Sequence, residues 1–330
     1  HLFSRSRLIR TEISTLIGLM LKNPIDYTLP APPALDKYIE ATEALLEEIH
    51  HAMSASFWQD IDPTKAAEAG FNPFTSGAAL REPIFYGGES AYSFQYRDFS
   101  PVKYANDDTW LITNKGFSIQ DARNVVLAIS QLQDEKVMSV MRAMHGTPQE
   151  TWTLLPGNAF SVQEVADYGH INPEIVGKIL SAFAVPTGAH NEQFKALHDF
   201  NIANASPLIR MPDGNFLLFH IYSLVEALYE APFYWMGADK AYASTAMQNR
   251  GVFTEQFAVE RLRKVFGAEN VIANIDIYES KDTKLAEIDV LVLFGNRALV
   301  LQAKSKRLTL EARRGNDLQI KDDFKKSIQD

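Results

Sequence analysis

Cysteine is absent from the 330 residues of the chain. Disulfide bonds, cysteine-ligated zinc sites and cysteine nucleophiles are therefore excluded, and we expect a cytoplasmic protein. The eight histidines show no HxH or HExxH spacing, so the usual histidine-based metal motifs are missing too. No apolar run approaches the roughly 20 residues that a membrane-spanning helix needs, and we expect no membrane contact.

The remaining composition is ordinary, but the charge is unevenly distributed. Hydrophobic residues make up 46% of the chain and charged residues 22%, as in most globular proteins. Residues 250–330 carry 15 basic and 13 acidic side chains, whereas residues 1–249 carry 17 and 28. The first 249 residues are thus strongly acidic and are not expected to bind nucleic acid on their own.

The length predicts two or three domains, and we place them at residues 1–115, 116–249 and 250–330. Within the first, residues 5–22 and 34–55 have the apolar spacing of helices. Residues 79–111 are dense in aromatic side chains and predict short strands and loops. These aromatic rings could stack on bases, but packing between two helical layers is the interpretation that we favour.

The second domain is predicted to be helical and to contain a winged-helix-like unit. A long helix follows Ser118, and residues 160–186 resemble a helix-turn-helix in which Ser161 caps the first helix and Pro173 opens the second. Residues 207–221 predict a hairpin resembling a wing. A DNA-reading helix needs several basic or amide side chains, and here the second helix offers only Lys178, which favours a structural role.

The third domain contains the most informative stretch of the chain. Residues 288–294 and 298–303 are two apolar runs, separated by Gly295-Asn296. Glycine at the first central position is typical of a two-residue type II′ hairpin turn. Because both runs are apolar throughout, we expect a hairpin that is buried on both faces at the centre of a sheet.

This turn predicts which residues lie opposite each other. If Phe294 pairs with Arg297, Asp289 lies opposite Gln302. Lys304 falls on the same face as Gln302, because side chains alternate along a strand. A carboxylate, an amide and an ammonium group then converge in an otherwise apolar hairpin, where burial is unfavourable unless they are paired or bind a ligand.

A second carboxylate is expected near these three groups. Residues 254–266 predict an amphipathic helix with Thr254 as its N-cap. Glu255 lies in line with the apolar stripe of this helix and should face the sheet. Glu260 lies on the opposite side and should face solvent.

Glu255, Asp289 and the Gln302-Ala303-Lys304 tripeptide together resemble the motif of the PD-(D/E)XK nuclease superfamily. The resemblance is to its Mrr-like and NERD (nuclease-related) branch, in which Gln can replace the usual Glu. It covers about the last 80 residues and implies a C-terminal α/β domain of the restriction-endonuclease type. The expected fold is therefore multidomain, with a mostly α N-terminal region before this α/β domain.

The resemblance implies a metal-dependent nuclease that binds Mg²⁺ or Mn²⁺. Asp289 would be the principal metal ligand, supported by the Gln302 amide oxygen and the Ala303 carbonyl, with Glu255 binding directly or through water. Lys304 would orient the attacking water and stabilise negative charge. The expected partner is nucleic acid, with DNA favoured, in prokaryotic defence or DNA processing. The alternative is a catalytically inactive module that binds nucleic acid or a protein.

Two further expectations concern the surface and the end of this domain. A basic cluster could follow a phosphate backbone or could simply be solvated; it consists of Lys306, Arg307, Arg313 and Arg314. Residues 316–330 predict a helix capped by Asn316, with no apolar run after it to close the sheet. We therefore expect the natural chain to continue, or a second copy or another protein to cover the open edge.

Overall fold

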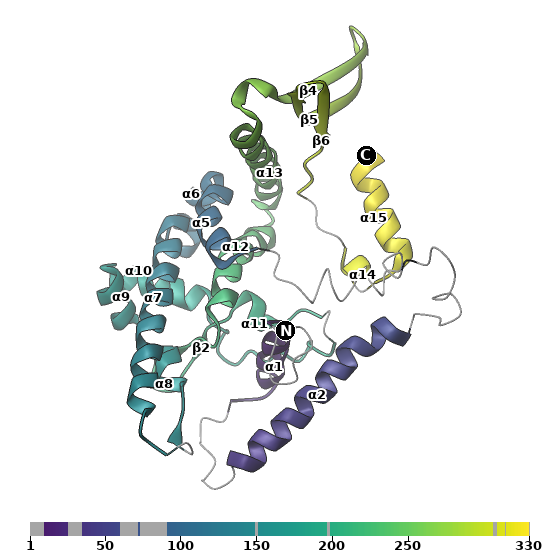
Figure 1. Cartoon of the computed structure of the whole chain (residues 1–330). Helices are drawn as coiled ribbons and strands as arrows, with labels where there is room; N and C mark the ends of the chain where they lie inside the picture. Colours follow the sequence, from purple (N-terminus) through teal and green to yellow (C-terminus); the bar gives the residue numbers. More distant parts are fainter. Residues whose placement is uncertain are drawn as a thin grey trace.

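The computed structural model shows a helical body and a small sheet near the C-terminal end of the chain (Figure 1). It describes residues 10–25, 35–59, 72, 91–148, 151–196, 199–305, 309–313 and 315–329. The longer helices are α1 (Arg10–Met20), α2 (Leu35–Gln59), α5 (Ser93–Lys103), α6 (Asp108–Lys115), α7 (Ile119–Met144), α9 (Val162–Gly169), α10 (Pro173–Ala182), α12 (Ile221–Ala238), α13 (Ala243–Phe266) and α15 (Asp317–Gln329). Short helical segments are η3 (Ala105–Asp107), α8 (Leu155–Asn158), α11 (Ile202–Ala205), η5 (Ala268–Asn270) and α14 (Leu310–Arg313).

The main hydrophobic core lies where α5, α7, α9, α10 and α12 meet. Helix α7 begins as predicted, because Ser118 and Asp121 form reciprocal side-chain to backbone hydrogen bonds at its first turn. Large rings such as Phe160 and Phe183 are almost fully buried in this core. Burial of such side chains is the main stabilising contribution to the body.

The aromatic segment was expected to form strands and loops, and this expectation is wrong for the part that is described. Residues 93–115 form α5, η3 and α6, while residues 79–90 lie outside the described part of the chain. Tyr96 and Tyr104 are buried, and Tyr96 packs against Tyr222 and Tyr229 of α12. The rings therefore join helical layers, which is the interpretation that was favoured over base stacking.

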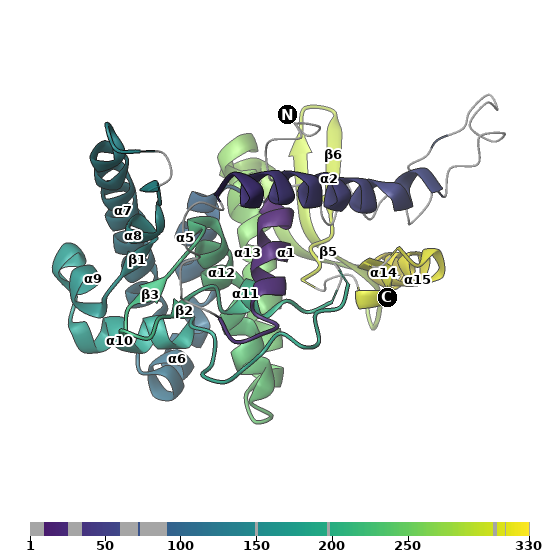
Figure 2. The same cartoon turned by 90° about the horizontal axis from the view of Figure 1, so that it is seen from below.

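The predicted helix-turn-helix and hairpin are both present. Ser161 caps α9, and Asn172 caps α10 with Pro173 in its first turn. Strands β2 (Ile209–Arg210) and β3 (Phe216–Leu217) are antiparallel, and β1 (Ala159–Phe160) pairs with β3 to give the order β1-β3-β2. Figure 2 shows this small sheet against α7, α9 and α10.

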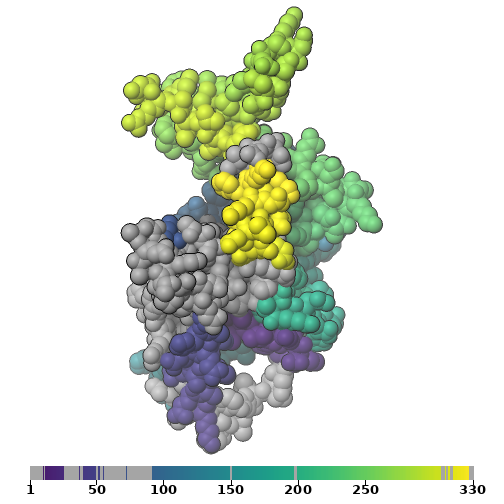
Figure 3. All heavy atoms as spheres, turned by 90° about the vertical axis from the view of Figure 1, so that its right-hand side faces the viewer, coloured from purple at the N-terminus to yellow at the C-terminus, as the bar shows by residue number. Residues whose placement is uncertain are grey.

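The C-terminal sheet is antiparallel with the order β4-β5-β6. Its strands are β4 (Val271–Ser280), β5 (Thr283–Phe294) and β6 (Arg297–Leu301). One face packs on α13 through a small core of Val259, Val271, Val290 and Val292. In Figures 1 and 3 the sheet projects from the helical body.

Two expectations about this sheet and its helix are wrong. The hairpin is not buried on both faces, since Leu299 and Val300 of β6 are 46% and 58% exposed. Among the described residues, β6 pairs only with β5 and forms an edge. Thr254 is not an N-cap, because α13 begins at Ala243 and the Thr254 hydroxyl donates a hydrogen bond to the Arg250 carbonyl within the helix.

Two remaining features concern helix ends and length. The Asn316 side chain accepts a hydrogen bond from the Gln319 backbone, as expected for the cap of α15. In the part of the chain that the structure describes, every helix is too short or too polar to cross a membrane.

Candidate active site

The β5–β6 turn sets the register that the sequence predicts. Gly295 has a φ of 61°, while Asn296 is not among the residues with positive φ, as a type II′ turn requires. Phe294 pairs with Arg297, and the pairing continues to Val290 and Leu301. Asp289 and Gln302 come next along the chain, and the structure brings them together as predicted. Strand β6 ends at Leu301, however, so the expected alternation along a strand does not extend to Lys304.

Gln302 extends the ladder with its side chain rather than with its backbone. Its Oε1 accepts a hydrogen bond from the Asp289 N–H at 3.0 Å, and its Nε2 donates to the Glu287 carbonyl at 3.1 Å. The amide therefore occupies one donor and one acceptor position of β5. Gln302 consequently fixes the β5 backbone on both sides of Ile288, whatever else its oxygen binds.

Asp289 is the most buried polar residue of the sheet, with 8% of its surface exposed. Its Oδ2 accepts a hydrogen bond of 2.6 Å from the Ala303 N–H. From the described residues, Oδ1 accepts no hydrogen bond. The carboxylate is thus oriented by the segment directly after β6 that carries the Gln302-Ala303-Lys304 tripeptide, and one oxygen remains for a cation.

Glu255 is close enough to this group to be influenced by its charge. Partial burial raises the pKa of Glu255, and the negative charges of Asp289 and then Glu287 raise it further, while Lys304 opposes the shift. Glu255 is half-buried, whereas Glu260 is exposed, as the helical stripe predicted. Two carboxylates that repel each other beside one lysine form an arrangement that a divalent cation would stabilise.

The donor set is suited to a hard cation but contains few carboxylates. Within the described ranges, no three histidine, aspartate or glutamate side chains are close enough to enclose a metal ion. A cation held by Asp289 and Glu255 would complete its shell with the Ala303 carbonyl and water. Magnesium suits such a site, since it usually retains several waters and binds few carboxylates.

Glu287 is a neighbour of the site that the motif did not include. It precedes Asp289 by two residues, and its carboxylate accepts a hydrogen bond of 2.7 Å from Lys284. Its charge contributes to the raised pKa of Glu255. The two-residue alternation along a strand was the available signal, because it places Glu287 and Asp289 on one face.

The side chains of the expected basic cluster lie outside the described part of the chain. Lys306, Arg307 and Arg314 lie outside the described residues, and for Arg313 only the backbone, in α14, is described.

Comparison of the chain with the known protein families, with curated proteins and with solved structures finds no match.

Proposed function

We propose that residues 250–330 form a nuclease unit of the PD-(D/E)XK type, resembling its Mrr-like and NERD branch. Its reaction would be metal-dependent hydrolysis of phosphodiester bonds in nucleic acid, with DNA as the expected substrate. The observation that supports this most is the position of Asp289. It is buried, faces Gln302 across the hairpin, and is held by the Ala303 N–H within electrostatic reach of Glu255.

Each residue would have a defined task in this reaction. Asp289 and Glu255 would hold Mg²⁺ or Mn²⁺ together with the Ala303 carbonyl, and Gln302 would hold Asp289 in place or bind as a weak neutral ligand. The cation would polarise a phosphoryl oxygen and lower the pKa of a bound water. Lys304 would orient the attacking water and stabilise the negative charge that develops on the phosphate.

The setting that we propose is prokaryotic defence or DNA processing, by resemblance to similar nuclease modules. A second candidate is an inactive module that binds nucleic acid or a protein. It is favoured by two observations. The Gln302 amide is engaged with the β5 backbone, and among the described residues no three histidine, aspartate or glutamate side chains are grouped closely enough to hold a metal ion. The two functions differ in whether bound nucleic acid is cut.

Cleavage of supercoiled plasmid in the presence of Mg²⁺ or Mn²⁺ tests the proposal. The Lys304→Ala variant should lose about 100- to 1,000-fold in rate, the typical effect of removing one group that stabilises developing negative charge. Glu255→Ala should lose cleavage, whereas Glu260→Ala on the exposed side of the same helix should retain it.

The outcomes separate the two candidates. Metal-dependent cleavage that disappears in Lys304→Ala supports the nuclease. Plasmid binding without cleavage under any of these conditions supports the inactive module. Cleavage that survives both Lys304→Ala and Glu255→Ala would arise from a contaminant or from another site, and the proposal would be wrong.

A further inference from the structure

A concave surface on the winged-helix-like region, apart from the C-terminal sheet, is not used by the proposed function. It is a shallow hollow, open to solvent, with a volume of about 690 Å³ between α10, the end of α6 and the β2–β3 hairpin. We call it the α10 hollow and define it by residues that line it, namely Lys115, Gly177, Lys178, Ser181, Arg210 and Gly214. Three of these six residues are cations, and they come from three different elements.

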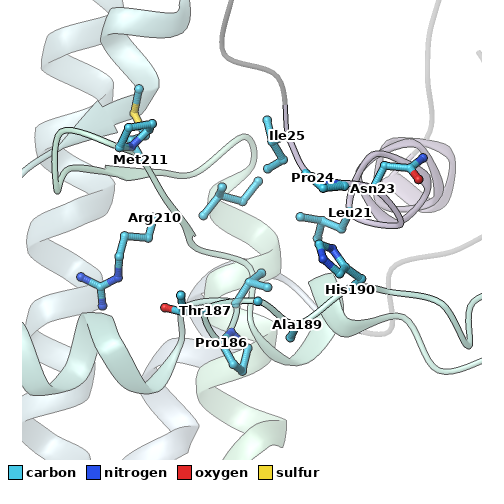
Figure 4. A pocket seen from close by; sticks show the side chains of 14 residues that line it. Leu21, Asn23, Pro24, Ile25, Pro186, Thr187, Ala189, His190, Arg210 and Met211 are labelled. Carbon is cyan, nitrogen blue, oxygen red and sulfur yellow. The ribbon is translucent and has the colours of Figure 1, made fainter.

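Arg210 is held toward this hollow by its neighbours. Its Nη2 donates a hydrogen bond of 3.3 Å to the Ser181 hydroxyl of α10, and its guanidinium lies 4.7 Å from the centre of the Phe216 ring. Figure 4 shows the Arg210 side chain directed away from Leu21 and Ile25, which together with Arg210 line a neighbouring hollow of about 280 Å³. The hairpin therefore presents Arg210 to α10.

Lys178 and Lys115 approach the same space from the other side. Lys178 lies across Gly116, since a Cβ added at Gly116 would be 3.5 Å from the Lys178 Nζ. The Lys115 ammonium lies 4.8 Å from the centre of the Trp235 ring. This ring contact positions Lys115 without adding a negative charge, and partial burial lowers the pKa of its ammonium. A nearby anion would stabilise both lysines.

One acidic residue also lines the hollow. Glu174 pairs with Lys178 at 2.7 Å, in the i,i+4 arrangement on α10. Both side chains are exposed, and exposed pairs of this kind contribute little, so an incoming phosphate can compete for Lys178. The local charge of the hollow is thus positive although residues 1–249 as a whole are acidic.

The chemistry of the hollow suits phosphates and not base edges. Apart from Lys178, the exposed polar side chains of α10 are Glu174 and Ser181, too few for base-specific contacts. Arginine and lysine contacts to phosphates position nucleic acid without reading sequence. We propose that the α10 hollow binds the phosphodiester backbone of nucleic acid independently of sequence. This goes beyond the cutting site and needs no metal.

Salt-dependent binding tests this proposal on the full chain. The probe is a fluorescent duplex DNA of about 24 base pairs, titrated in EDTA at several salt concentrations. Each cation removed from a phosphate contact should reduce the slope of log K against log salt by about 1. Lys178→Ala should therefore bind more weakly with a shallower slope, and Arg210→Gln should do the same. Glu174→Gln should bind more tightly.

The matched control is Arg142→Ala, an exposed cation at the far end of α7, which should bind like the wild type. Unfolding midpoints show whether each variant is folded. Where Arg210→Gln is destabilised, the binding of Lys178→Ala alone decides the test. Wild-type affinity and slope in Lys178→Ala, or a slope change equal to that of Arg142→Ala, would overturn the inference. If the protein cuts DNA with Mg²⁺ but gives this binding result, the proposed nuclease function stands and only the inference about the α10 hollow is wrong.

Discussion

Replacing Gln302 separates its structural contribution from a metal-binding one. In Gln302→Met, the side chain keeps its length and loses both hydrogen bonds to the β5 backbone. Each such bond contributes a net 0.5–1.5 kcal/mol, and Gln302 is exposed, so we expect a local loss of about 1–2 kcal/mol. Gln302→Glu keeps the oxygen that accepts from Asp289 but removes the N–H that donates to the Glu287 carbonyl. In EDTA this variant should lower the free energy of unfolding by about 1 kcal/mol.

Amide hydrogen exchange at Asp289 measures this loss where it occurs. Because the Asp289 N–H donates to Gln302 Oε1, its protection should fall by a factor of roughly 5–30 in Gln302→Met. Gln256→Met, on the exposed face of α13, is the matched control and should leave it unchanged. Unchanged protection of the Asp289 N–H in Gln302→Met would refute the inference that the Gln302 side chain holds the β5 backbone.

Metal binding by the same variants tests the other role of Gln302. The added carboxylate of Gln302→Glu should tighten Mg²⁺ or Mn²⁺ binding if residue 302 contacts the cation. Calorimetric titration measures this, and unchanged affinity would leave Gln302 with the structural role alone.

Three other variants test separate features of the fold. Burial and the neighbouring carboxylates raise the pKa of Glu255 above its ordinary value of 4.5, so the folded protein favours the protonated side chain. The contribution of Glu255 to the free energy of unfolding is therefore complete below about pH 4.5 and is lost as the pH rises through the raised pKa. Glu255→Gln in EDTA should therefore lose less thermal stability than the wild type between about pH 4.5 and neutrality, and a parallel decline would contradict this cause. Gly295→Ala forces a side chain into a φ of 61° and should cost about 1–2 kcal/mol in urea unfolding. Asp107→Ala removes the buried acceptor of Tyr242 and Asn249 and should cost about 2–3 kcal/mol, while an unchanged midpoint would show that this contact does not hold α13.

The sequence predicts the local geometry of the hairpin well because short-range rules determine it. A Gly-Asn pair between two apolar runs defines the turn, and the turn defines which residues face each other. Asp289 and Gln302 are neighbours for this reason. The same local rules correctly place Ser118, Ser161 and Asn316 at helix starts.

The incorrect expectations concern features that depend on the rest of the chain. The apolar composition of β6 cannot show whether another element covers it, and among the described residues its outer face is exposed. Thr254 resembles a cap only if the preceding residues are not helical, and α13 extends eleven residues before it. Tyr96 suits a strand by propensity, but its packing against Tyr222 and Tyr229 of α12 stabilises a helix.

The α10 hollow could not be predicted because its cations are far apart in sequence. Lys115, Lys178 and Arg210 belong to a helix end, a second helix and a hairpin, and only the folded chain brings them together. In the sequence, Lys178 is the single basic side chain that α10 offers, and this favoured a structural role for the helix. The hydrogen bonds of the Gln302 side chain to the β5 backbone could not be predicted either, because the sequence gives the residue type but not the direction of its amide.

A crystal soaked in Mn²⁺ and measured for anomalous scattering tests the central claim most directly. The account predicts one peak bound by Asp289 Oδ1 and the Ala303 carbonyl, with the Glu255 carboxylate on its open side, directly or through water, and Lys304 nearby. Mn²⁺ fits this oxygen donor set as Mg²⁺ does. A site with no peak at saturating Mn²⁺, or with Glu255 turned away from Asp289, would contradict the nuclease assignment.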